Sequence, residues 1–526
     1  MLEKIFCAKC IGIEAVPVTV EVDIRNGIGI HLVGLGDMAV KESLLRTVNA
    51  LQSMEFSIPG KKIVINLAPA DLRKNGSGYD LPIALGIIAS SGQRSLPALG
   101  NYIIMGELGL NGEVREINGA LAYAEMAASL GLRGCILPLK SALEAVEFKG
   151  ISVYGISTMM DAIRILSDAE DCSDLLIWNR TEYLSLRDSK TPEGASQYMD
   201  FSEIMGQEGA KRGIEIAAAG GHNTLLVGSP GSGKSSLAKA MAGILPPMTM
   251  EESLQTSKIY SVAGRSPHGA GLIRQRPFRA PHYSASLPAI IGGGSDNIMP
   301  GEMSLAHNGV LFCDEFCEAP KKMIEALRAP MEDRKVVISR LKSKVEYPSS
   351  FMLVAATNPC PCGWWGEGER CTCTPGRREA YLEKLSGPIL DRIDIQLWLK
   401  SVEPGKIVRG APSESSATVR QRVEKARDIQ KERFRDEAIS TNAEMDGRMI
   451  RKYCPLDEPC KDFLEKVMTR MGMSARSCTR IIKLARTIAD LEAAVSGSPS
   501  PGPIDLRHLS EAVGYRFLDK KNIFDV

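Results

Sequence analysis

Eight consecutive residues have the types and spacing of a phosphate-binding loop: Gly228, Ser229, Pro230, Gly231, Ser232, Gly233, Lys234 and Ser235. An apolar run, 224–227, precedes them and a helical pattern follows, which is the strand–loop–helix context that G-x-x-x-x-G-K-[ST] requires. The glycines let backbone N–H groups face phosphate oxygens, Lys234 would contact the β- and γ-phosphates, and the Ser235 hydroxyl would ligate Mg²⁺. This context favours a site for ATP and Mg²⁺ over an incidental Gly/Ser loop.

A second apolar run, 310–313, ends in two adjacent carboxylates, Asp314 and Glu315. Asp314 would hold Mg²⁺ through water, and Glu315 would activate the attacking water. One acid would suffice for binding, so the pair predicts hydrolysis. A strand that happens to end in surface acids is the alternative.

Length and pattern predict how these residues are positioned. A chain of 526 residues is too long for one hydrophobic core and suggests roughly three domains. Short strand-like runs (18–22, 62–67, 102–105) alternate with helical ones (39–51, 81–91, 120–130), which predicts an α/β domain over 1–166. A polar linker is expected over 167–199. A second α/β block over 200–400 has buried-strand runs at 224–227, 310–313 and 351–356. Residues 401–526 are predicted to be a helical lid, with helices such as 419–435 and 475–491.

Composition sets limits on partners and compartment. Lys and Arg total 64 against 63 Asp and Glu, so any nucleic-acid surface must be a local patch. The apolar stretch 81–89 is far shorter than the ~18 residues of a membrane span, so no membrane association is expected. The first residues lack the apolar run of a secretory signal, which favours the cytoplasm. The 13 cysteines are then expected to be thiols or metal ligands.

Four of these cysteines form a C-x-C, eight-residue, C-x-C set: Cys360, Cys362, Cys371 and Cys373. Four thiolates so spaced could close a tetrahedral Zn²⁺ site without a role in catalysis. The spacing is tighter than in common zinc fingers, and four idle thiols are the alternative. Cys7 and Cys10 have no partner pair and are expected at a buried strand end.

Six further segments resemble the magnesium-chelatase-like ComM/YifB family, and the similarity covers nearly the whole chain. They are Asp200-Phe-Ser-Glu-Ile-Met-Gly-Gln-Glu-Gly-Ala-Lys-Arg, Ala217-Ala-Ala-Gly-Gly-His-Asn, Arg276-Pro-Phe-Arg-Ala-Pro-His, Pro300-Gly-Glu-Met-Ser-Leu-Ala-His, Asn358-Pro-Cys-Pro-Cys-Gly and Ser386-Gly-Pro-Ile-Leu-Asp-Arg-Ile-Asp. The resemblance implies an AAA+ ATPase core of the clade shared with chelatase motors and MCM helicases, working as a homo-hexamer.

The resemblance also implies roles for three residues outside the phosphate loop. Asn358 resembles sensor 1, which positions the lytic water, with Thr357 as its support. Arg392 resembles the arginine finger that reaches a neighbouring subunit's ATP. An ion-pair network is the alternative for Arg392. Arg476 resembles sensor 2 on the lid, acting on its own or its neighbour's site, and Arg480 is a weaker candidate.

The first domain resembles the Lon-protease type of α/β domain, notably at 74–81 and 106–119. That family uses a serine activated by a lysine, but the aligned positions here hold Gly78 and Leu121. Ser77 lies next to the first position, yet the second motif offers no lysine. The domain is therefore expected to contact a partner or shape the ring rather than to cleave peptides.

Two basic segments are expected to face the pore of a ring. One spans 258–295 without any acid and carries Lys258, Arg265, Arg274, Arg276, Arg279, His268 and His282. The other is a predicted hairpin over 334–344, with Arg334, Lys335, Arg340, Lys342 and Lys344. Such loops would bind a nucleic-acid backbone with little sequence preference. Solvated loops that seal subunit contacts are the alternative.

The favoured function is an ATP-dependent, helicase-like DNA motor. As the family resemblance implies, it would migrate branches in single-stranded or branched DNA, with recombination proteins, during natural transformation. A chelatase- or MoxR-like ATPase that remodels a protein is the alternative, although the chain lacks a metal-ion adhesion domain. Regulatory binding with slow turnover fits poorly with Glu315, Asn358 and Arg392 together.

Overall fold

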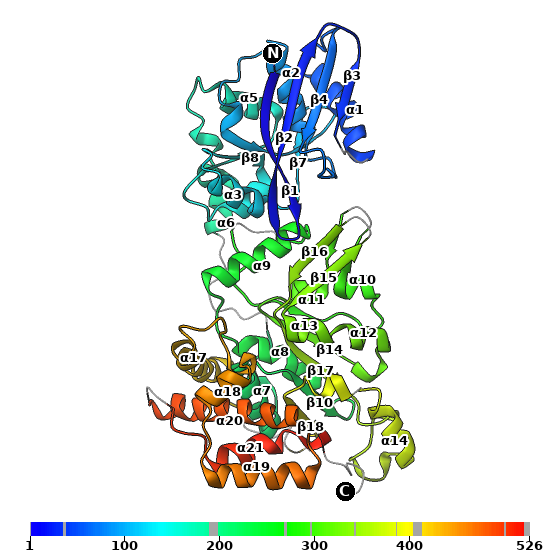
Figure 1. Cartoon of the computed structure of the whole chain (residues 1–526), viewed down its shortest axis with the longest axis vertical. Helices are drawn as coiled ribbons and strands as arrows, with labels where there is room; N and C mark the ends of the chain where they lie inside the picture. The colour runs from blue at the N-terminus through cyan, green and yellow to red at the C-terminus, as the bar shows by residue number, and fades with distance from the viewer. Residues whose placement is uncertain are drawn as a thin grey trace.

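The computed structural model describes residues 2–34, 38–188, 198–267, 271–294, 297–340, 343–385, 387–402, 405, 413–498 and 501–519. Residues 189–197 of the predicted linker, His268, Ser295, Lys342 and Ser386 lie outside the described residues. Figure 1 shows an elongated molecule with the first domain at one end and the lid at the other.

The first domain is built on a mixed sheet in the order β3-β4-β2-β1-β5-β8-β9. The long strands β1 (Leu2–Ile11) and β2 (Glu14–Arg25) are antiparallel, with Leu2 opposite Asp23. Side chains of β4 (Lys62–Ala68) alternate between buried and half-buried, as in a strand with one face on the core. The remaining elements are β3 (Ile30–Val33), β5 (Tyr102–Ile104), β6 (Glu107–Leu108), β7 (Val114–Arg115), β8 (Gly134–Pro138), β9 (Ser152–Ile156), α1 (Met38–Ser53), α2 (Asp80–Ser90), α3 (Ala120–Ser129), α4 (Leu139–Ala142) and α5 (Met159–Ser167).

Part of the predicted linker is structured. Two 3₁₀ turns and helix α6 (Thr181–Asp188) occupy 173–188. Leu175 and Ile177 are buried in the core of the first domain, and the Trp178 indole donates to Val146 O at 2.9 Å. The segment has many polar residues around Asp171 and only a few apolar ones, so the sequence predicted a linker. The few apolar side chains nevertheless pack against the first domain.

The second domain has a parallel sheet in the order β11-β14-β17-β10-β18. Strands β10 (Thr224–Gly228), β14 (Val310–Cys313) and β17 (Met352–Thr357) are buried throughout, as expected for a parallel sheet covered on both faces. β11 (Phe278–Arg279) and β18 (Ile395–Leu399) form its edges. The register places Leu226 beside Ala356 and Cys313 beside Ala355, so the carboxyl ends of the three central strands meet at one edge.

Helices and two small hairpins surround this sheet. The helices are α7 (Glu208–Gly220), α8 (Lys234–Ile244), α9 (Met250–Val262), α10 (Leu287–Ile291), α11 (Glu302–Leu305), α12 (Lys321–Ala326), α13 (Arg328–Asp333), α14 (Pro375–Leu382) and α15 (Gly387–Leu390). β12 (Gly292–Gly293) pairs with β13 (Met299–Pro300), and β15 (Lys335–Arg340) pairs with β16 (Ser343–Pro348). The β15–β16 pairing confirms the hairpin predicted from the sequence.

The last domain is helical, as predicted. It contains α17 (Ser416–Arg433), α18 (Gly447–Tyr453), α19 (Glu458–Met471), α20 (Ala475–Ser496) and α21 (Leu506–Gly514). Helix α20 buries Ile481, Leu484, Ile488 and Leu491 at helical spacing, in a core shared with the second domain. Across the residues that the structure describes, no helix combines the length and apolarity needed to cross a membrane.

Candidate nucleotide site and the arginine edge

The phosphate loop lies between the carboxyl end of β10 and the first residue of α8, Lys234. Gly231 and Gly233 have φ angles of 77° and 94°, a left-handed conformation that side-chain-bearing residues rarely adopt. In this conformation the loop curls around the N-terminus of α8, where unpaired backbone N–H groups favour an anion. Gln207 supports the loop from outside by donating to Ser232 O at 3.0 Å.

The groups expected to hold ATP and Mg²⁺ lie close together. The Ser235 hydroxyl donates to Asp314 Oδ2 at 3.0 Å, so the two predicted Mg²⁺ ligands are already adjacent. A hydroxyl and a carboxylate are oxygen donors of the kind that Mg²⁺ prefers. Ser232 Oγ is buried in the loop and has no hydrogen-bond partner among the residues that the structure describes, as expected of a group that binds a ligand. The residues present therefore fit a magnesium nucleotide.

Three oxygen acceptors hold the Lys234 side chain in place. Its ammonium donates to Gly228 O at 2.6 Å, Ser229 O at 3.0 Å and Asn358 Oδ1 at 3.2 Å. Burial lowers the pKa of Lys234, and the nearby carboxylates of Asp314 and Glu315 partly offset this. The contact with Asn358 joins the predicted sensor to the phosphate loop directly.

Glu315 has an unusual backbone conformation. Its φ is 48° and its side chain is exposed, directly after the buried strand β14. Its N–H donates to Asp314 Oδ1 at 2.9 Å, which compensates part of the strain. A left-handed conformation costs a residue other than glycine about 1–3 kcal/mol and is concentrated at functional sites. The turn separates the two carboxylates, leaving Asp314 with Ser235 and Glu315 open to solvent.

The four cysteines of the loop 360–373 (the cysteine loop) converge. Their sulfur atoms all lie within 4.8 Å of one another. Cys360 Sγ is 3.3 Å from Cys362 Sγ and 3.8 Å from Cys371 Sγ, distances too long for a disulfide. The geometry thus agrees with the donor set expected for a tetrahedral zinc site.

Arg392 is buried and paired in the isolated chain. Its side chain contacts Glu332 Oε1 at 2.7 Å and donates to Pro388 O at 2.7 Å, while its Nε has no partner among the described residues. The partner is therefore Glu332 from α13 rather than the aspartates on either side in sequence. Because Glu332 is half exposed, the pair lies at the surface of the domain.

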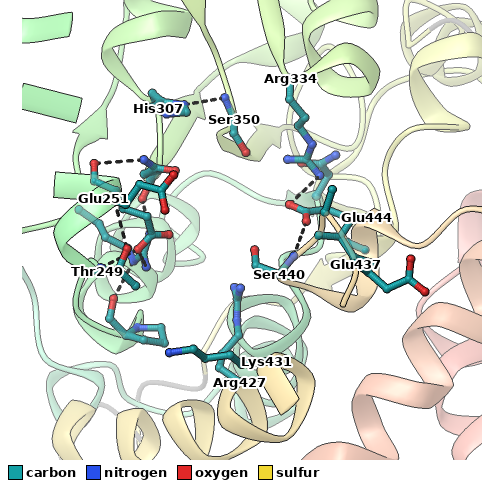
Figure 2. A pocket seen from close by; sticks show the side chains of 18 of the residues that line it. Thr249, Glu251, His307, Arg334, Ser350, Arg427, Lys431, Glu437, Ser440 and Glu444 are labelled. Atoms are coloured by element: carbon teal, nitrogen blue, oxygen red, sulfur yellow. Dashed lines mark hydrogen bonds and ion pairs between the residues drawn. The ribbon is translucent and has the colours of Figure 1, made fainter. Parts of the chain in front are cut away.

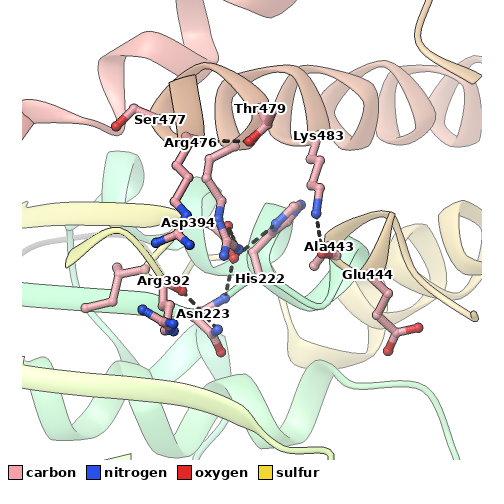
Figure 3. Close-up of polar contacts among 12 residues, drawn as sticks. His222, Asn223, Arg392, Asp394, Ala443, Glu444, Arg476, Ser477, Thr479 and Lys483 are labelled. Carbon is pink, nitrogen blue, oxygen red and sulfur yellow. Dashed lines mark hydrogen bonds and ion pairs between the residues drawn. The ribbon is translucent and has the colours of Figure 1, made fainter. Parts of the chain in front are cut away.

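Arg476 and Arg480 lie in the first turns of α20. Figure 3 shows Arg476 extending from this helix toward Asp394. Arg480 contacts Asp394 Oδ1 at 2.6 Å, and Arg476 lies 3.9 Å from Asp391 Oδ2. Asp394 is fully buried. Burial opposes its charge, yet Arg480 and His222 together hold the pKa of its carboxyl well below the ordinary range. Arg480 thus anchors the lid, while Arg476 is exposed.

The arginines and the phosphate loop of one chain lie at opposite edges of the sheet. β10 and β18 are parallel, with Thr224 beside Ile395 and Gly228 beside Leu399. Arg392 precedes the start of β18, whereas the phosphate loop follows the end of β10. At ~3.3 Å per residue, the length of β10 separates these edges by about 13 Å.

A groove of about 1180 Å³ opens between the second domain and the lid, on the arginine side (Figure 2). Its walls include Glu332, Arg334, Asp394 and Arg480, together with Arg427 and Lys431 of α17. Among the described residues that line it, none belongs to the phosphate loop. This groove is thus distinct from the nucleotide site of the same chain.

The first basic segment does not present free cations. Lys258 contacts Glu14 at 2.8 Å and Glu125 at 2.6 Å, and Arg274 contacts Glu147 at 2.9 Å, all acids of the first domain. The other pairs in this segment are Arg265–Glu302, Arg279–Glu302 and Arg276–Glu252. The sequence showed no acid between 258 and 295, but it missed these ion pairs because the acids lie outside that range. That the segment faces a pore stays a prediction.

This segment instead joins the first two domains. Ser261 O accepts from Gly119 N at 3.1 Å, and the turn at Gly12 lies so close to Glu346 that a β-carbon there would be 2.7 Å from Glu346 O. Figure 1 shows the β1–β2 hairpin reaching toward β16, with α9 beside it. On the second basic segment Lys335 pairs with Glu346, whereas Arg340 and Lys344 are exposed near the hairpin tip.

The two positions that align with a serine–lysine dyad are Gly78 and Leu121. A side chain at Gly78 would contact Met105, Leu121 is buried, and the hydroxyl of the neighbouring Ser77 donates to Glu107. A carboxylate partner of this kind does not replace the lysine of a serine–lysine dyad.

Comparison with known proteins explains this combination of domains. The sequence model described as magnesium chelatase, subunit ChlI matches residues 200–407, that of subunit ChlI of Mg-chelatase matches 20–141, and that of the ChlI C-terminal part matches 413–516. The protein YifB of Salmonella typhimurium is 41% identical over 512 residues, which cover 97% of this chain and 96% of YifB. The chain belongs to the ComM/YifB family of magnesium-chelatase-like AAA+ proteins.

Two further relatives agree with this family. The competence protein ComM of Haemophilus influenzae is 39% identical over 522 residues, 98% of this chain and 97% of ComM. The archaeal Lon protease of Methanothermobacter thermautotrophicus is 46% identical over 79 residues, 15% of this chain and 11% of that protein. For a ComM/YifB chain, the structure adds contacts that sequence reasoning missed, namely Gln207, Glu332 and Glu367. Each contacts a residue distant in sequence, so the local sequence does not show the contact, although Gln207 lies in one of the segments that carry the family resemblance.

Proposed function

We propose that this protein is an ATP-driven DNA motor of the cytoplasm that works as a ring of identical subunits. The observation that carries the proposal is the separation of the phosphate loop from Arg392 and Arg476. An arginine at the opposite edge of the sheet cannot reach the ATP of its own chain. It can reach the ATP of a neighbour that docks edge to edge, and a repeated head-to-tail contact of this kind closes into a ring. Six subunits, as the family resemblance implies, would complete it.

The residues of the site divide the work of hydrolysis. The phosphate loop and Lys234 bind the phosphates, and Mg²⁺ held by Ser235 and Asp314 would neutralise charge on them. Glu315 accepts a proton from the attacking water, and the Asn358 amide orients that water. Arg392 of the neighbour must leave Glu332 to stabilise the charge on the departing phosphate. Arg392 would thus pair with Glu332 in one state and with the neighbour's ATP in the other. This change of partner would link hydrolysis to movement between subunits.

Two observations support DNA as the substrate. Arg340 and Lys344 are exposed near the tip of the β15–β16 hairpin, and this hairpin packs directly against the domain that hydrolyses ATP. In addition, the name of ComM connects a full-length relative with competence, which requires handling of incoming DNA. We extend this role, natural transformation with recombination proteins, to the present chain. Backbone phosphates of single-stranded or branched DNA are the expected contacts.

The test is the salt dependence of DNA binding. Substitution of both Arg340→Glu and Lys344→Glu should weaken binding of a single strand at least tenfold and lower the slope of log K against log salt by about 2. The matched control changes two exposed lysines of the first domain, Lys61→Glu and Lys149→Glu. Equal losses in both variants would show only a general charge effect and would argue against the hairpin as the contact.

A protein-remodelling motor is the second candidate. Val337 on the same hairpin and Leu287 in α10 are 42% and 40% exposed, and apolar groups there suit an unfolded polypeptide better than a phosphate backbone. Absence of DNA binding by the wild-type protein would favour this function.

The cysteine loop is proposed as a structural zinc site. Tetrahedral coordination at a Zn–S distance of about 2.3 Å places sulfur atoms ~3.8 Å apart. The observed separations of 3.3, 3.8 and 3.7 Å are close to this value. Metal analysis of the purified protein should find one zinc per chain.

A further inference from the structure

The cysteine loop lies against the phosphate loop. A β-carbon at Gly363 would be 3.0 Å from two ring atoms of Pro230, and Gly363 has a left-handed φ of 82°. The close approach therefore requires glycine at this position. Because Gly363 directly follows Cys362, a ligand of the proposed zinc, the position of this contact depends on the geometry of the four thiols.

A second contact links the two loops by hydrogen bonds. Glu367 Oε1 accepts from the Ser229 hydroxyl at 2.9 Å and from Ser401 N at 2.7 Å. Ser229 is the second residue of the phosphate loop and is 2% exposed. Hydrogen bonds to a carboxylate in such a site are stronger than neutral ones. Glu367 thus joins the phosphate loop to Ser401, the second residue after β18.

The cysteine loop has little regular structure to hold it in place. Between β17 and α14 the described residues form one 3₁₀ turn, Gly368–Arg370. Two of its sulfur atoms belong to buried residues, Cys360 and Cys373. The Trp365 ring packs edge-on against Trp398 at 5.1 Å. Thiols are weak hydrogen-bonding groups, so four of them without metal would stabilise the loop poorly.

The loop also continues from the predicted sensor. Asn358, which contacts Lys234 at 3.2 Å, is two residues before Cys360. Gly363 N donates to Cys360 O at 2.9 Å and so closes a tight turn around the first two ligands. The cysteine loop therefore touches the nucleotide site at three points: Asn358, Pro230 and Ser229.

We infer that the metal held by Cys360, Cys362, Cys371 and Cys373 positions the phosphate loop through Gly363 and Glu367, so that nucleotide affinity depends on metal occupancy. This inference rests on the proposed zinc site and is independent of the DNA substrate. Glu367 is a positioning residue, because it acts on nucleotide through Ser229. The metal neither contacts nucleotide nor takes part in hydrolysis.

The test measures zinc content and the Kd for a fluorescent ADP analogue on the full chain. Removal of zinc with the zinc-selective chelator TPEN should raise the Kd about tenfold, and re-addition of zinc should restore it. Cys362→Ser should lose zinc and show the same rise. Cys172→Ser, which changes a cysteine of the first domain, should keep both zinc and affinity. Protein that contains no zinc as purified, with no tight binding of added zinc, would overturn the site itself.

Substitution of Glu367 tests whether the cysteine loop affects nucleotide affinity through this residue while the zinc site stays folded. Glu367→Ala should keep one zinc per chain and still raise the Kd about tenfold, whereas Glu367→Gln, which can accept both hydrogen bonds, should stay near wild type. Stripping zinc from Glu367→Ala should add less than tenfold, because only the contact at Gly363 then remains to be lost. Wild-type affinity in Glu367→Ala, or a zinc-free protein that binds ADP normally, would overturn the coupling while leaving the zinc site and the motor function intact.

Discussion

The side-chain amide of Asn223 donates a hydrogen bond to the backbone carbonyl of Arg392 at 3.1 Å. Asn223 directly precedes β10, and the phosphate loop begins only where β10 ends. The backbone N–H of Asn223 also donates to Asp394 Oδ2 at 3.0 Å. The predicted arginine finger is therefore tied to the edge of the sheet farthest from the phosphate loop of its own chain.

This separation predicts complementation between two inactive chains. Lys234→Ala should lose nucleotide binding, and Arg392→Ala should bind nucleotide but lose at least 10²-fold in ATPase rate. Mixed rings should regain activity, because an Arg392→Ala chain supplies an intact phosphate loop and its Lys234→Ala neighbour supplies the arginine. Steady-state ATPase rate against mixing ratio measures this. A rate that stays at the level of the two separate variants at every ratio would mean that both residues act within one chain.

Glu315→Gln should bind ATP normally and lose at least 10²-fold in ATPase rate. The amide keeps the shape of the side chain but cannot accept the proton of water. The rate of phosphate release and the ATP affinity are the two measurements. Glu318→Gln is the control, since Glu318 is exposed three residues later. Normal turnover in Glu315→Gln would remove this residue from the chemistry.

Lys258→Ala should weaken attachment of the first domain without changing DNA binding. Removal of this buried cation leaves Glu14 and Glu125, which are 64% and 37% exposed, without their shared partner. Because water screens both carboxylates, the cost is about 1 kcal/mol. Protease cleavage between the domains should accelerate, while the affinity for a single strand stays unchanged. Lys140→Ala removes an exposed pair with Glu116 and serves as control. If Lys258→Ala lost as much DNA affinity as the variant carrying Arg340→Glu and Lys344→Glu, segment 258–295 would contact DNA, as the sequence predicted.

Stability of the second domain should fall as pH drops from about 6.5 to about 4. Burial lowers the pKa of His307 to about 4, and its Nδ1 accepts from Ser350 N at 3.0 Å. The unfolded chain binds a proton near the ordinary pKa of 6.5, so the stabilisation is complete above that pH and is lost as pH falls toward 4. The full difference is about 3 kcal/mol.

Denaturant unfolding of His307→Gln at several pH values checks this. The substitution should flatten the decline in the free energy of unfolding between pH 6.5 and 4, whereas His31→Gln on an exposed strand should not. An unchanged slope in His307→Gln would show that other groups control acid stability.

The features that could be predicted from the sequence are those marked by residues close together along the chain. The strands around Thr224, Val310 and Met352, the phosphate loop and the paired acids all have local patterns. The parallel sheet brings Asn358 to Lys234 and Asp314 to Ser235. The sequence did not predict pairs across the fold. Lys258 has no acid near it in sequence, because Glu14 and Glu125 are more than a hundred residues away. Glu367 has no distinguishing local pattern, because its partner Ser229 is also more than a hundred residues away.

The central claim is that ATP hydrolysis is coupled to DNA. The most direct test is the steady-state ATPase rate of the purified protein with and without single-stranded and branched DNA, at low and moderate salt. The account predicts strong stimulation by DNA that weakens as salt rises and is lost in the variant carrying Arg340→Glu and Lys344→Glu. An ATPase rate that DNA leaves unchanged at both salt concentrations would contradict it.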